Sequence, residues 1–494
     1  MNTFESEEEK TMTRNLTEQG DTVSAPTPFT REKRATAQSA DRYGNLPLGA
    51  VIRTDERYNK PGLFQGPRGW DYWNLLENPK DYQNPNLWPD KRPTYFIGQM
   101  MMPAGSSLTI RGKFPHARYF KLALYRFERN TFIALGGEDL AAYDIEPDPG
   151  SANPYQVGAD RTVTNRSYTL HIVADEPPKN PAARPINTIY AGKEGQPIQP
   201  VFRIYLSDEG YDGAGLGQAH ESSTEGPLVT YEAKLADGTV VSAEEITRQW
   251  VQRLGSAPPP MDAEAWYGLI NAKTNDPALD PASAPARKDA QWELFWGMKY
   301  TVAGAFMPPE ERAQIKLQTE MEGGGDPTTA YLVTYLSRKF GPVYVFRGKM
   351  PTFPNTFAGT KTMPDGQVKY WSVCTMASAP SGELWDGVSD MMVPVDKDGF
   401  YTIVVSLPED RPKNATYENG VVWIDWGPGE GLQDPRDRKD WGMLLMRYMV
   451  CQSDWENSPA KIHKPGTEEA VMGPYYPKGY YTTKAEFAAK GVKK

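Results

Sequence analysis

Short runs of apolar residues, many of them alternating with polar ones, recur through residues 93–460. They are rich in Val, Ile, Tyr and Thr, and Gly, Pro, Asn and Asp separate them. The clearest examples are SLTIRG (107–112), YFKLALYRF (119–127), VFRIYLSD (201–208), VYVFRG (343–348), YTIVVSL (401–407) and LLMRYMV (444–450). This composition and spacing are typical of β-strands. Because helical patterns do not alternate with the runs, the pattern predicts antiparallel sandwiches or barrels rather than βαβ units.

The pattern also occurs twice. Residues 93–115 align without a gap onto residues 329–351. Further matches follow in the same order, and they pair Tyr119-Phe120 with Tyr370-Trp371, Asp144 with Asp390, Tyr168-Thr169 with Tyr401-Thr402, and Arg203 with Arg447. An ordered series of matches with loops of different length is typical of two copies of one structural unit. We therefore predict a mainly β protein with two homologous antiparallel β-sandwich or barrel domains and a helical insert between them.

Differences in composition and in the spacing of apolar residues divide the chain into six segments. They are a disordered lead (1–45), an irregular aromatic strap (46–92), a first β domain (93–236), a helical insert (237–328), a second β domain (329–460) and a C-terminal tail (461–494). The insert begins with a capping box, Ser242 to Glu245, followed by Ile246, Trp250 and Leu254 at intervals of four.

Further helices are expected from Asp262, at 291–298 and at 309–317. The insert is either a lid or wedge between the β domains or a long linker.

Bulk composition excludes several partners. The formal net charge is −9, so there is no basic surface to favour nucleic acid or an anionic membrane. No run of 18 apolar residues occurs, and the acidic N-terminus lacks the apolar core of a secretory signal. We expect a cytoplasmic protein. Cys374 and Cys451 are the only cysteines, which excludes a disulfide scaffold, and buried free thiols are favoured over a pair.

The duplicated charges are candidates for ion pairs. Arg111 and Arg347 end predicted strands, and Arg203 and Arg447 lie inside apolar runs. A charge in an apolar strand is costly unless it is paired, so we expect each arginine to pair with an acid of its own domain, with Asp390 among the acids. The alternative is an anion-binding arginine in each domain.

Other polar residues occur in one copy alone. Residues 113–119, KFPHARY, bring together Lys113, His116 and Arg118. A histidine near an arginine and an acid is suited to acid–base chemistry, so His116, Arg118 and Asp144 are the candidate catalytic residues. The candidate substrate contacts are Lys113, Tyr119 and Trp371. The alternative is that His116 is an ordinary surface residue.

The four histidines have no metal-ligand spacing, and no nucleotide fingerprint is present. We therefore expect neither a metal nor a cofactor.

Several motifs carry a family resemblance. They are RGKFPHARYF (111–120), DIEPDPGSANP (144–154), VFRIYLSDEG (201–210), VYVFRGKMPTFP (343–354), KYWSVCTM (369–376) and GFYTIVVSLPEDRPKNAT (399–416). Over about 93–460 the chain resembles uncharacterised bacterial proteins, many of them actinobacterial, that carry one or two β domains of a domain-of-unknown-function family. The resemblance implies a fold and no particular activity. Many of those relatives carry export signals.

Two classes of function fit these observations. One is a cofactor-independent acid–base enzyme, a lyase, hydratase, isomerase or hydrolase, with a small apolar or aromatic substrate between the β domains. The 57 aromatic residues and 18 methionines suit such a pocket. The other is a non-catalytic protein that binds a ligand such as a carbohydrate, or that assembles with itself. Duplication makes a homo-oligomer a natural expectation.

Overall fold

The computed structural model describes 15 stretches of the chain and leaves gaps between them. They are residues 71–73, 88, 90–97, 100–127, 134–193, 197–217, 229–242, 245–246, 250, 268, 283–317, 326, 328–378, 383–429 and 438–490, where the single residues count as stretches of their own. The predicted lead (1–45), Leu254 and the helix expected from Asp262 lie outside these residues.

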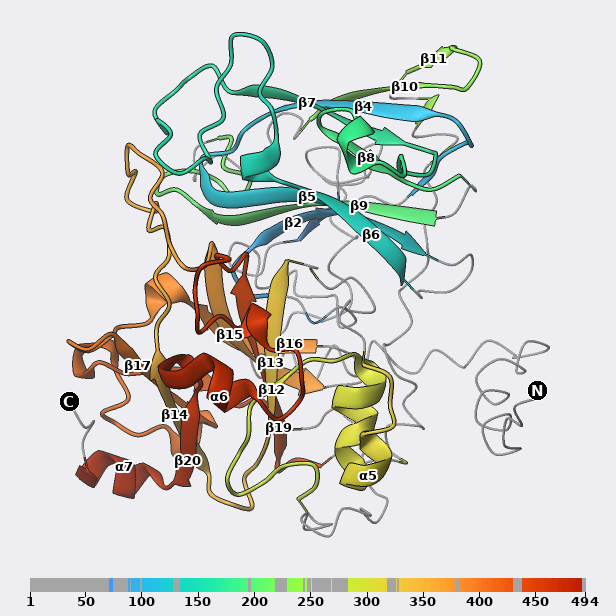
Figure 1. Ribbon diagram of the computed structural model, residues 1–494. Helices are drawn as coiled ribbons and strands as arrows, with labels where there is room; N and C mark the ends of the chain where they lie inside the picture. The colour runs from blue at the N-terminus through green and yellow to red at the C-terminus, as the bar shows by residue number, and fades with distance from the viewer. Residues whose placement is uncertain are drawn as a thin grey trace, which may run out of the picture. The chain divides into compact units, whose positions relative to one another are not determined.

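The chain is mainly β, and its first two sheets pack face to face as one sandwich (Figure 1). One sheet runs in the order β1 (Asp71–Trp73), β2 (Thr94–Ile97), β9 (Pro197–Ser207), β5 (Ala117–Phe127) and β6 (Ala134–Ala141), and β3 (Met100–Met101) also pairs with β9. The other runs in the order β11 (Val240–Val241), β10 (Thr230–Lys234), β4 (Ser107–Lys113), β7 (Ser167–Val173) and β8 (Thr188–Tyr190). Leu108, Ile110, Phe120, Leu122 and Leu170 are fully buried between them. We call this pair of sheets the first sandwich.

The next two sheets form the second sandwich. One runs in the order β12 (Glu293–Leu294), β13 (Thr329–Ser337), β19 (Trp441–Met449), β15 (Tyr370–Ser378) and β16 (Glu383–Ser389). The other runs in the order β18 (Val422–Asp425), β17 (Phe400–Ser406), β14 (Val343–Lys349) and β20 (Lys478–Thr482). Their core contains Leu332, Tyr344, Phe346, Trp371 and Tyr401, all fully buried.

Two strand pairs depart from the predicted antiparallel order. β8 runs parallel to β7, and β18 runs parallel to β17. A parallel pair needs a connection long enough to return the chain to the start of its neighbour. Residues 174–187 and 407–421 provide these connections, with short 3₁₀ turns on the way. The sheets that contain β8 and β18 are therefore mixed.

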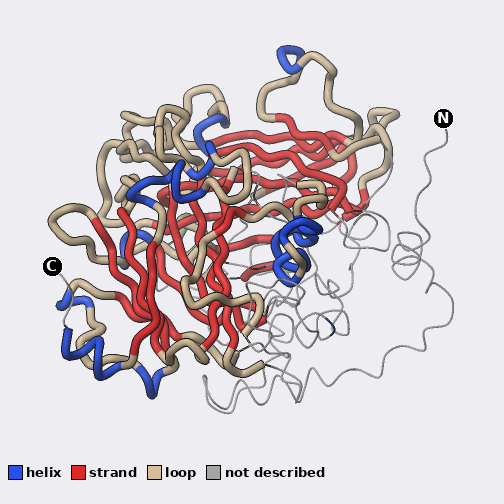
Figure 2. Tube along the Cα trace, turned by 60° about the horizontal axis from the view of Figure 1, so that its bottom comes forward, coloured by secondary structure: helices blue, strands red, loops and turns tan. Residues whose placement is uncertain are grey.

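The helices whose bounds lie within the described residues are short (Figure 2). They are η3 (Ala142–Asp144), η4 (Pro181–Ala183), η5 (Met298–Val302), η6 (Ala303–Phe306), α5 (Pro309–Arg312), η7 (Asp390–Met392), η8 (Pro408–Asp410), η9 (Tyr417–Asn419), η10 (Pro459–Lys461), α6 (Glu468–Met472), η11 (Gly473–Tyr475) and α7 (Lys484–Lys490). Near the predicted helix start, Ser242 Oγ accepts a hydrogen bond from the Glu245 N–H at 3.2 Å, as the capping box requires.

The helix predicted for 291–298 is wrong. Glu293 and Leu294 form β12, which pairs with β13. The backbone of this segment bonds to a neighbouring strand, while Trp292, Phe295 and Trp296 are buried. Short aromatic runs fit a strand edge as well as a helix turn, and tertiary packing decides between them. In the segment 309–317, α5 covers only Pro309–Arg312.

The two sandwiches pack against each other through the sheets that contain β5 and β15. We call these the interface sheets, and the other two the outer sheets. Tyr95, Tyr125 and Val201 of the first interface sheet share a buried cluster with Tyr331 and Val333 of the second. A loop of the second sandwich, residues 352–363, adds backbone hydrogen bonds to the first sandwich, such as the Glu209 N–H to the Phe357 carbonyl at 2.8 Å.

Candidate functional site

Charged residues occupy the middle of the apolar face where the two sandwiches meet. In the first interface sheet, Tyr95, Arg203 and Lys121 are direct neighbours across β2, β9 and β5. Neighbours in one row of a sheet project to the same face. All three are buried, with Lys121 fully enclosed.

A matching row crosses the second interface sheet. Tyr331, Arg447 and Ser372 are direct neighbours on β13, β19 and β15. They are buried as well. The two rows therefore present the same residue types in two of three positions and differ where Lys121 faces Ser372.

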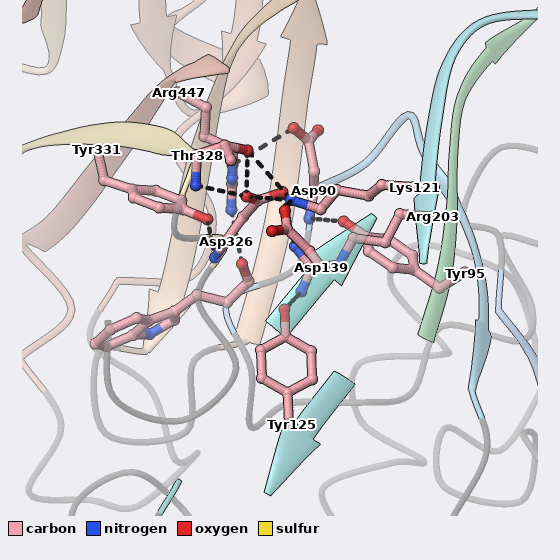
Figure 3. Close-up of polar contacts among 11 residues, drawn as sticks. Asp90, Tyr95, Lys121, Tyr125, Asp139, Arg203, Asp326, Thr328, Tyr331 and Arg447 are labelled. Atoms are coloured by element: carbon pink, nitrogen blue, oxygen red, sulfur yellow. Dashed lines mark hydrogen bonds and ion pairs between the residues drawn. The ribbon is translucent and has the colours of Figure 1, made fainter. Parts of the chain in front are cut away.

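Asp326 is the centre of one group of contacts, which we call the Asp326 half (Figure 3). Its Oδ1 lies 2.8 Å from Lys121 Nζ, and its Oδ2 lies 3.4 Å from Arg203 Nη1. The Thr328 N–H also donates to Oδ1, at 2.9 Å. Lys121 contacts a second carboxylate, that of Asp139 on β6. One buried carboxylate thus receives two cations and further hydrogen bonds.

The electrostatics of this half keep Asp326 ionised. Burial alone would raise the pKa of its carboxyl, but Lys121, Arg203 and the hydrogen bond from Thr328 outweigh burial and lower the pKa to about 2. Asp326 therefore carries its charge throughout the physiological range.

The second group of contacts, the Asp90 half, surrounds Asp90. Arg447 Nη1 lies 3.7 Å from Asp90 Oδ2, and the Ser372 hydroxyl donates to the same oxygen at 2.5 Å. Arg447 also donates to the Trp88 carbonyl oxygen at 2.6 Å. Burial, with Asp90 beside it, raises the pKa of the Cys374 thiol to about 12. This cysteine is consequently a protonated, unreactive thiol at neutral pH.

The two aspartates are exchanged between the sandwiches. Asp90 donates its backbone N–H to the hydroxyl of Tyr95, and Asp326 does the same to Tyr331, at 3.2 and 2.9 Å. Each aspartate is thus bound through its backbone next to its own sandwich. Its carboxylate, however, pairs with the arginine of the other sandwich.

The expectation of a partner in the same domain is therefore wrong for Arg203 and Arg447. Their side chains lie on the face that the other sandwich covers, and the acids that pair with them, Asp326 and Asp90, arrive with that sandwich. Arg111 and Arg347 do pair within their own sandwiches, with Glu232 and with Asp396.

The structure places the three predicted catalytic residues in separate environments. The half-buried ring of His116 stacks on Tyr211, with centroids 4.2 Å apart. Burial, together with the nearby Arg166 and Arg161, lowers the pKa of His116 to about 4, so the ring is neutral at pH 7. Asp144 is exposed in η3.

Arg118 is fully enclosed and contacts the second sandwich. Its Nη1 lies 2.6 Å from Asp390 Oδ1. This pair joins the two sandwiches. Asp390 is therefore in an ion pair, but with Arg118, a predicted catalytic residue, and not with an arginine of its own domain. The backbone N–H of Trp371 donates to the other oxygen of Asp390 at 2.9 Å.

The predicted substrate contacts are also dispersed. Lys113 is exposed at the end of β4. Tyr119 is buried beside Tyr205, with ring centroids 5.8 Å apart. Trp371 lies in the core of the second sandwich against Tyr401 and cannot meet a ligand there.

Asp90 and Asp326, the acids at the centres of the two halves, were not identified from the sequence as candidate site residues. A signal was nevertheless present, because Asp90 and Asp326 each precede by three residues the segments 93–115 and 329–351 that align without a gap. Extending that alignment backwards pairs the two aspartates. Lys121 had a signal too, as a charged residue inside the apolar run YFKLALYRF.

The outer sheets differ in what their solvent-side faces carry. In the second sandwich Val343, Val345 and Val404 are buried beneath Phe487 of α7. In the first, Thr109 and His171 are neighbours on β4 and β7, half-buried, with Thr109 Oγ1 and His171 Nδ1 3.3 Å apart. One face is apolar and covered, and the other is polar.

Within the described ranges, no cluster of three or more His, Cys, Asp or Glu side chains is arranged to hold a metal ion. Both cysteines are free. None of the helices found in these ranges is long and apolar enough to cross a membrane.

Comparison with known proteins yields structural similarity alone. No protein-family model matches the chain, and no curated protein matches it. A putative uncharacterized protein from Burkholderia cenocepacia is 12% identical, with a TM-score of 0.43, over 97% of this chain and 95% of that one. A protein from Vibrio parahaemolyticus is 11% identical, with a TM-score of 0.34, over 83% of this chain and 93% of that one.

Proposed function

We propose that this chain acts without turnover, as a structural protein in which two copies of a β-sandwich form one rigid body. The observation that carries the proposal is the exchange of Asp90 and Asp326 between the sandwiches. An interface whose arginines, lysine and exchanged aspartates are paired with one another joins two parts and leaves none of these buried groups open to a substrate.

Matching positions support the inference that the sandwiches are copies. The rows Tyr95–Arg203–Lys121 and Tyr331–Arg447–Ser372 lie on corresponding strands of sheets with the orders β2-β9-β5-β6 and β13-β19-β15-β16. Each sandwich also ends one sheet with a parallel pair.

The register refines one sequence match. Lys121 is opposite Ala141, and Ser372 is opposite Ser389, so Ala142 rather than Asp144 occupies the position of Asp390. The acid of that position is accordingly present in one copy alone, where it pairs with Arg118.

Energetics favour a joining role for these contacts. Removing one partner of a buried ion pair typically costs about 3–5 kcal/mol, because the other charge remains buried without compensation. The interface therefore resists separation of the sandwiches, since separation would have to break both exchanged pairs and the pair of Arg118 with Asp390.

A small-molecule screen tests the proposal against the acid–base enzyme. Compounds that raise the melting temperature are incubated with the wild-type chain and with His116→Ala, while His463→Ala, an exposed histidine near the C-terminus, serves as the matched control. We expect no compound to be converted in a His116-dependent way. Turnover that is lost in His116→Ala and kept in His463→Ala would overturn the structural role.

A second candidate function rests on the polar outer face of the first sandwich. The hydroxyls of Ser107 and Thr109, with His171 and the Arg111–Glu232 pair, suit a hydroxyl-rich ligand such as a carbohydrate. The matching positions of Thr109 and His171 in the second sandwich are Val345 and Val404.

Glycan binding by Thr109→Val/His171→Val tests this candidate, because the variant reproduces the pattern of the second sandwich. Binding should be lost with the fold intact, whereas Tyr417→Ser, at an exposed position of the second sandwich, should bind as the wild type does. Equal binding by both variants would contradict the assignment of this face.

A further inference from the structure

Lys121 is enclosed between two carboxylates. Its side chain is 0% exposed, and its Nζ contacts Asp139 and Asp326 (Figure 3). Lys121 is opposite Ala141 and Ala123 is opposite Asp139, so Lys121 and Asp139 are diagonal neighbours on one face of β5 and β6. Diagonal neighbours in a sheet lie within reach of a long side chain. The backbone thus holds the amine and this carboxyl group together.

The Asp90 half lacks both members of this pair. Ser372 occupies the position of Lys121. By the same register, Cys374 corresponds to Ala123, and its neighbour Gly387 occupies the position of Asp139. The lysine and the aspartate are therefore present together in one half and absent together from the other, while the arginine and the exchanged aspartate occur in both.

The two carboxylates beside Lys121 are not equivalent. Asp326 forms ion pairs with Lys121 and Arg203 and accepts hydrogen bonds from Thr328, and these contacts stabilise it as an anion. Asp139 Oδ2 forms an ion pair with Lys121. Among the described residues it accepts no hydrogen bond of good geometry. Asp139 Oδ2 is thus the carboxylate oxygen beside Lys121 with the fewest other partners among the described residues.

We infer that Lys121 and Asp139 condense to an amide, a covalent cross-link between β5 and β6. The Lys121 ammonium passes one proton to the Asp139 carboxylate, which gives a neutral amine and a carboxylic acid. The amine nitrogen then attacks Asp139 Cγ and forms the N–C bond. Asp326, hydrogen-bonded to that nitrogen, relays the second proton to the departing hydroxyl, the C–O bond breaks and water leaves. No oxidant, reductant or other reactant is needed.

The surroundings favour this reaction. Tyr119 and Tyr125 are buried on the same face of β5 and exclude solvent from the amine. The side chain of Asp139 is 22% exposed, which gives the released water a way out. The product replaces a buried ion pair by a neutral amide and leaves one arginine with one aspartate, as in the Asp90 half. The cross-link goes beyond the structural role proposed above and does not depend on it.

The mass of the intact, denatured full-length chain tests the cross-link. We expect the wild-type chain to be lighter than its sequence by one water molecule, and a protease digest to contain a branched peptide that joins Lys121 to Asp139. Lys121→Ser and Asp139→Gly, which copy the Asp90 half, should have the full mass of their sequences. Asp139→Asn should reach the same product mass as the wild type, through loss of ammonia.

A wild-type chain of full sequence mass would overturn the inference, whatever the variants do. A loss of water that the digest assigns elsewhere, to Lys121 with Asp326 or to a cyclised Asp-Gly sequence, would also overturn it. Because the decisive reading is made on the wild-type chain, a variant that fails to fold leaves the conclusion unaffected.

Discussion

The two halves of the interface share a frame and differ in charge. Both contain a tyrosine and an arginine side by side on neighbouring strands, and an aspartate that arrives with the other sandwich. The Asp326 half adds the buried cation Lys121 and the partly exposed Asp139, whereas the Asp90 half has Ser372 and Gly387 in their places. The shared residues hold the sandwiches together, and the added pair gives one half chemistry that the other cannot have.

The comparison predicts unequal losses when each aspartate is removed. Asp326→Ala leaves Arg203 without its anion and also removes the proton relay, so Lys121 stays uncondensed as a second buried cation. The substitution should cost about 3–5 kcal/mol of unfolding free energy or more. Asp90→Ala leaves Arg447 alone and should cost less. Urea titrations of the two variants measure the difference. Equal losses of unfolding free energy would show that Lys121 adds nothing to the stabilisation that Asp326 provides.

The same half should respond to acid. The pKa of Asp326 is about 2 in the folded chain and 3.8 as its ordinary value, so the folded state favours the ionised form. A depressed folded pKa adds stability that is fully present above the unfolded value and is lost as pH falls through the folded one. Between about pH 4 and pH 2 the wild type should therefore lose on the order of 2 kcal/mol more than Asp326→Asn.

Unfolding free energies measured across that range check the acid response. Asp90→Asn provides the control for general acid destabilisation, because it removes the exchanged aspartate of the other half and leaves Asp326 in place. A wild-type curve parallel to that of Asp326→Asn would contradict the assigned pKa.

The smallest effect is expected at the surface pairs. The side chains of Arg347 and Asp396 are 38% and 21% exposed, so their ion pair is screened by solvent. Arg347→Ala should cost less than about 1 kcal/mol, while Arg447→Ala, at the buried position, should cost several times more. Thermal unfolding of both variants ranks them. A large loss of unfolding free energy in Arg347→Ala would mean that the Arg347–Asp396 pair stabilises the fold despite its exposure.

Local sequence patterns predicted a mainly β chain, because alternation along a strand reports burial directly. They also predicted that Arg203 and Arg447 need partners. They could not predict which partners, because the partners are set by how the two sandwiches pack, which no local pattern encodes. The same limit explains why Trp371 was predicted to line a pocket although it lies in the core of the second sandwich. It also explains Arg118, which pairs with an acid of the other sandwich.

The central claim is that exchanged aspartates join the sandwiches, and a double-mutant cycle on Asp90 and Arg447 tests it most directly. These two residues belong to different sandwiches, and no lysine complicates their half. Unfolding free energies of Asp90→Asn, Arg447→Met and the double variant give the coupling energy, which should lie between about 1 and 3 kcal/mol. Losses that add to within about 0.5 kcal/mol would show that the two charges are not coupled and would contradict the account.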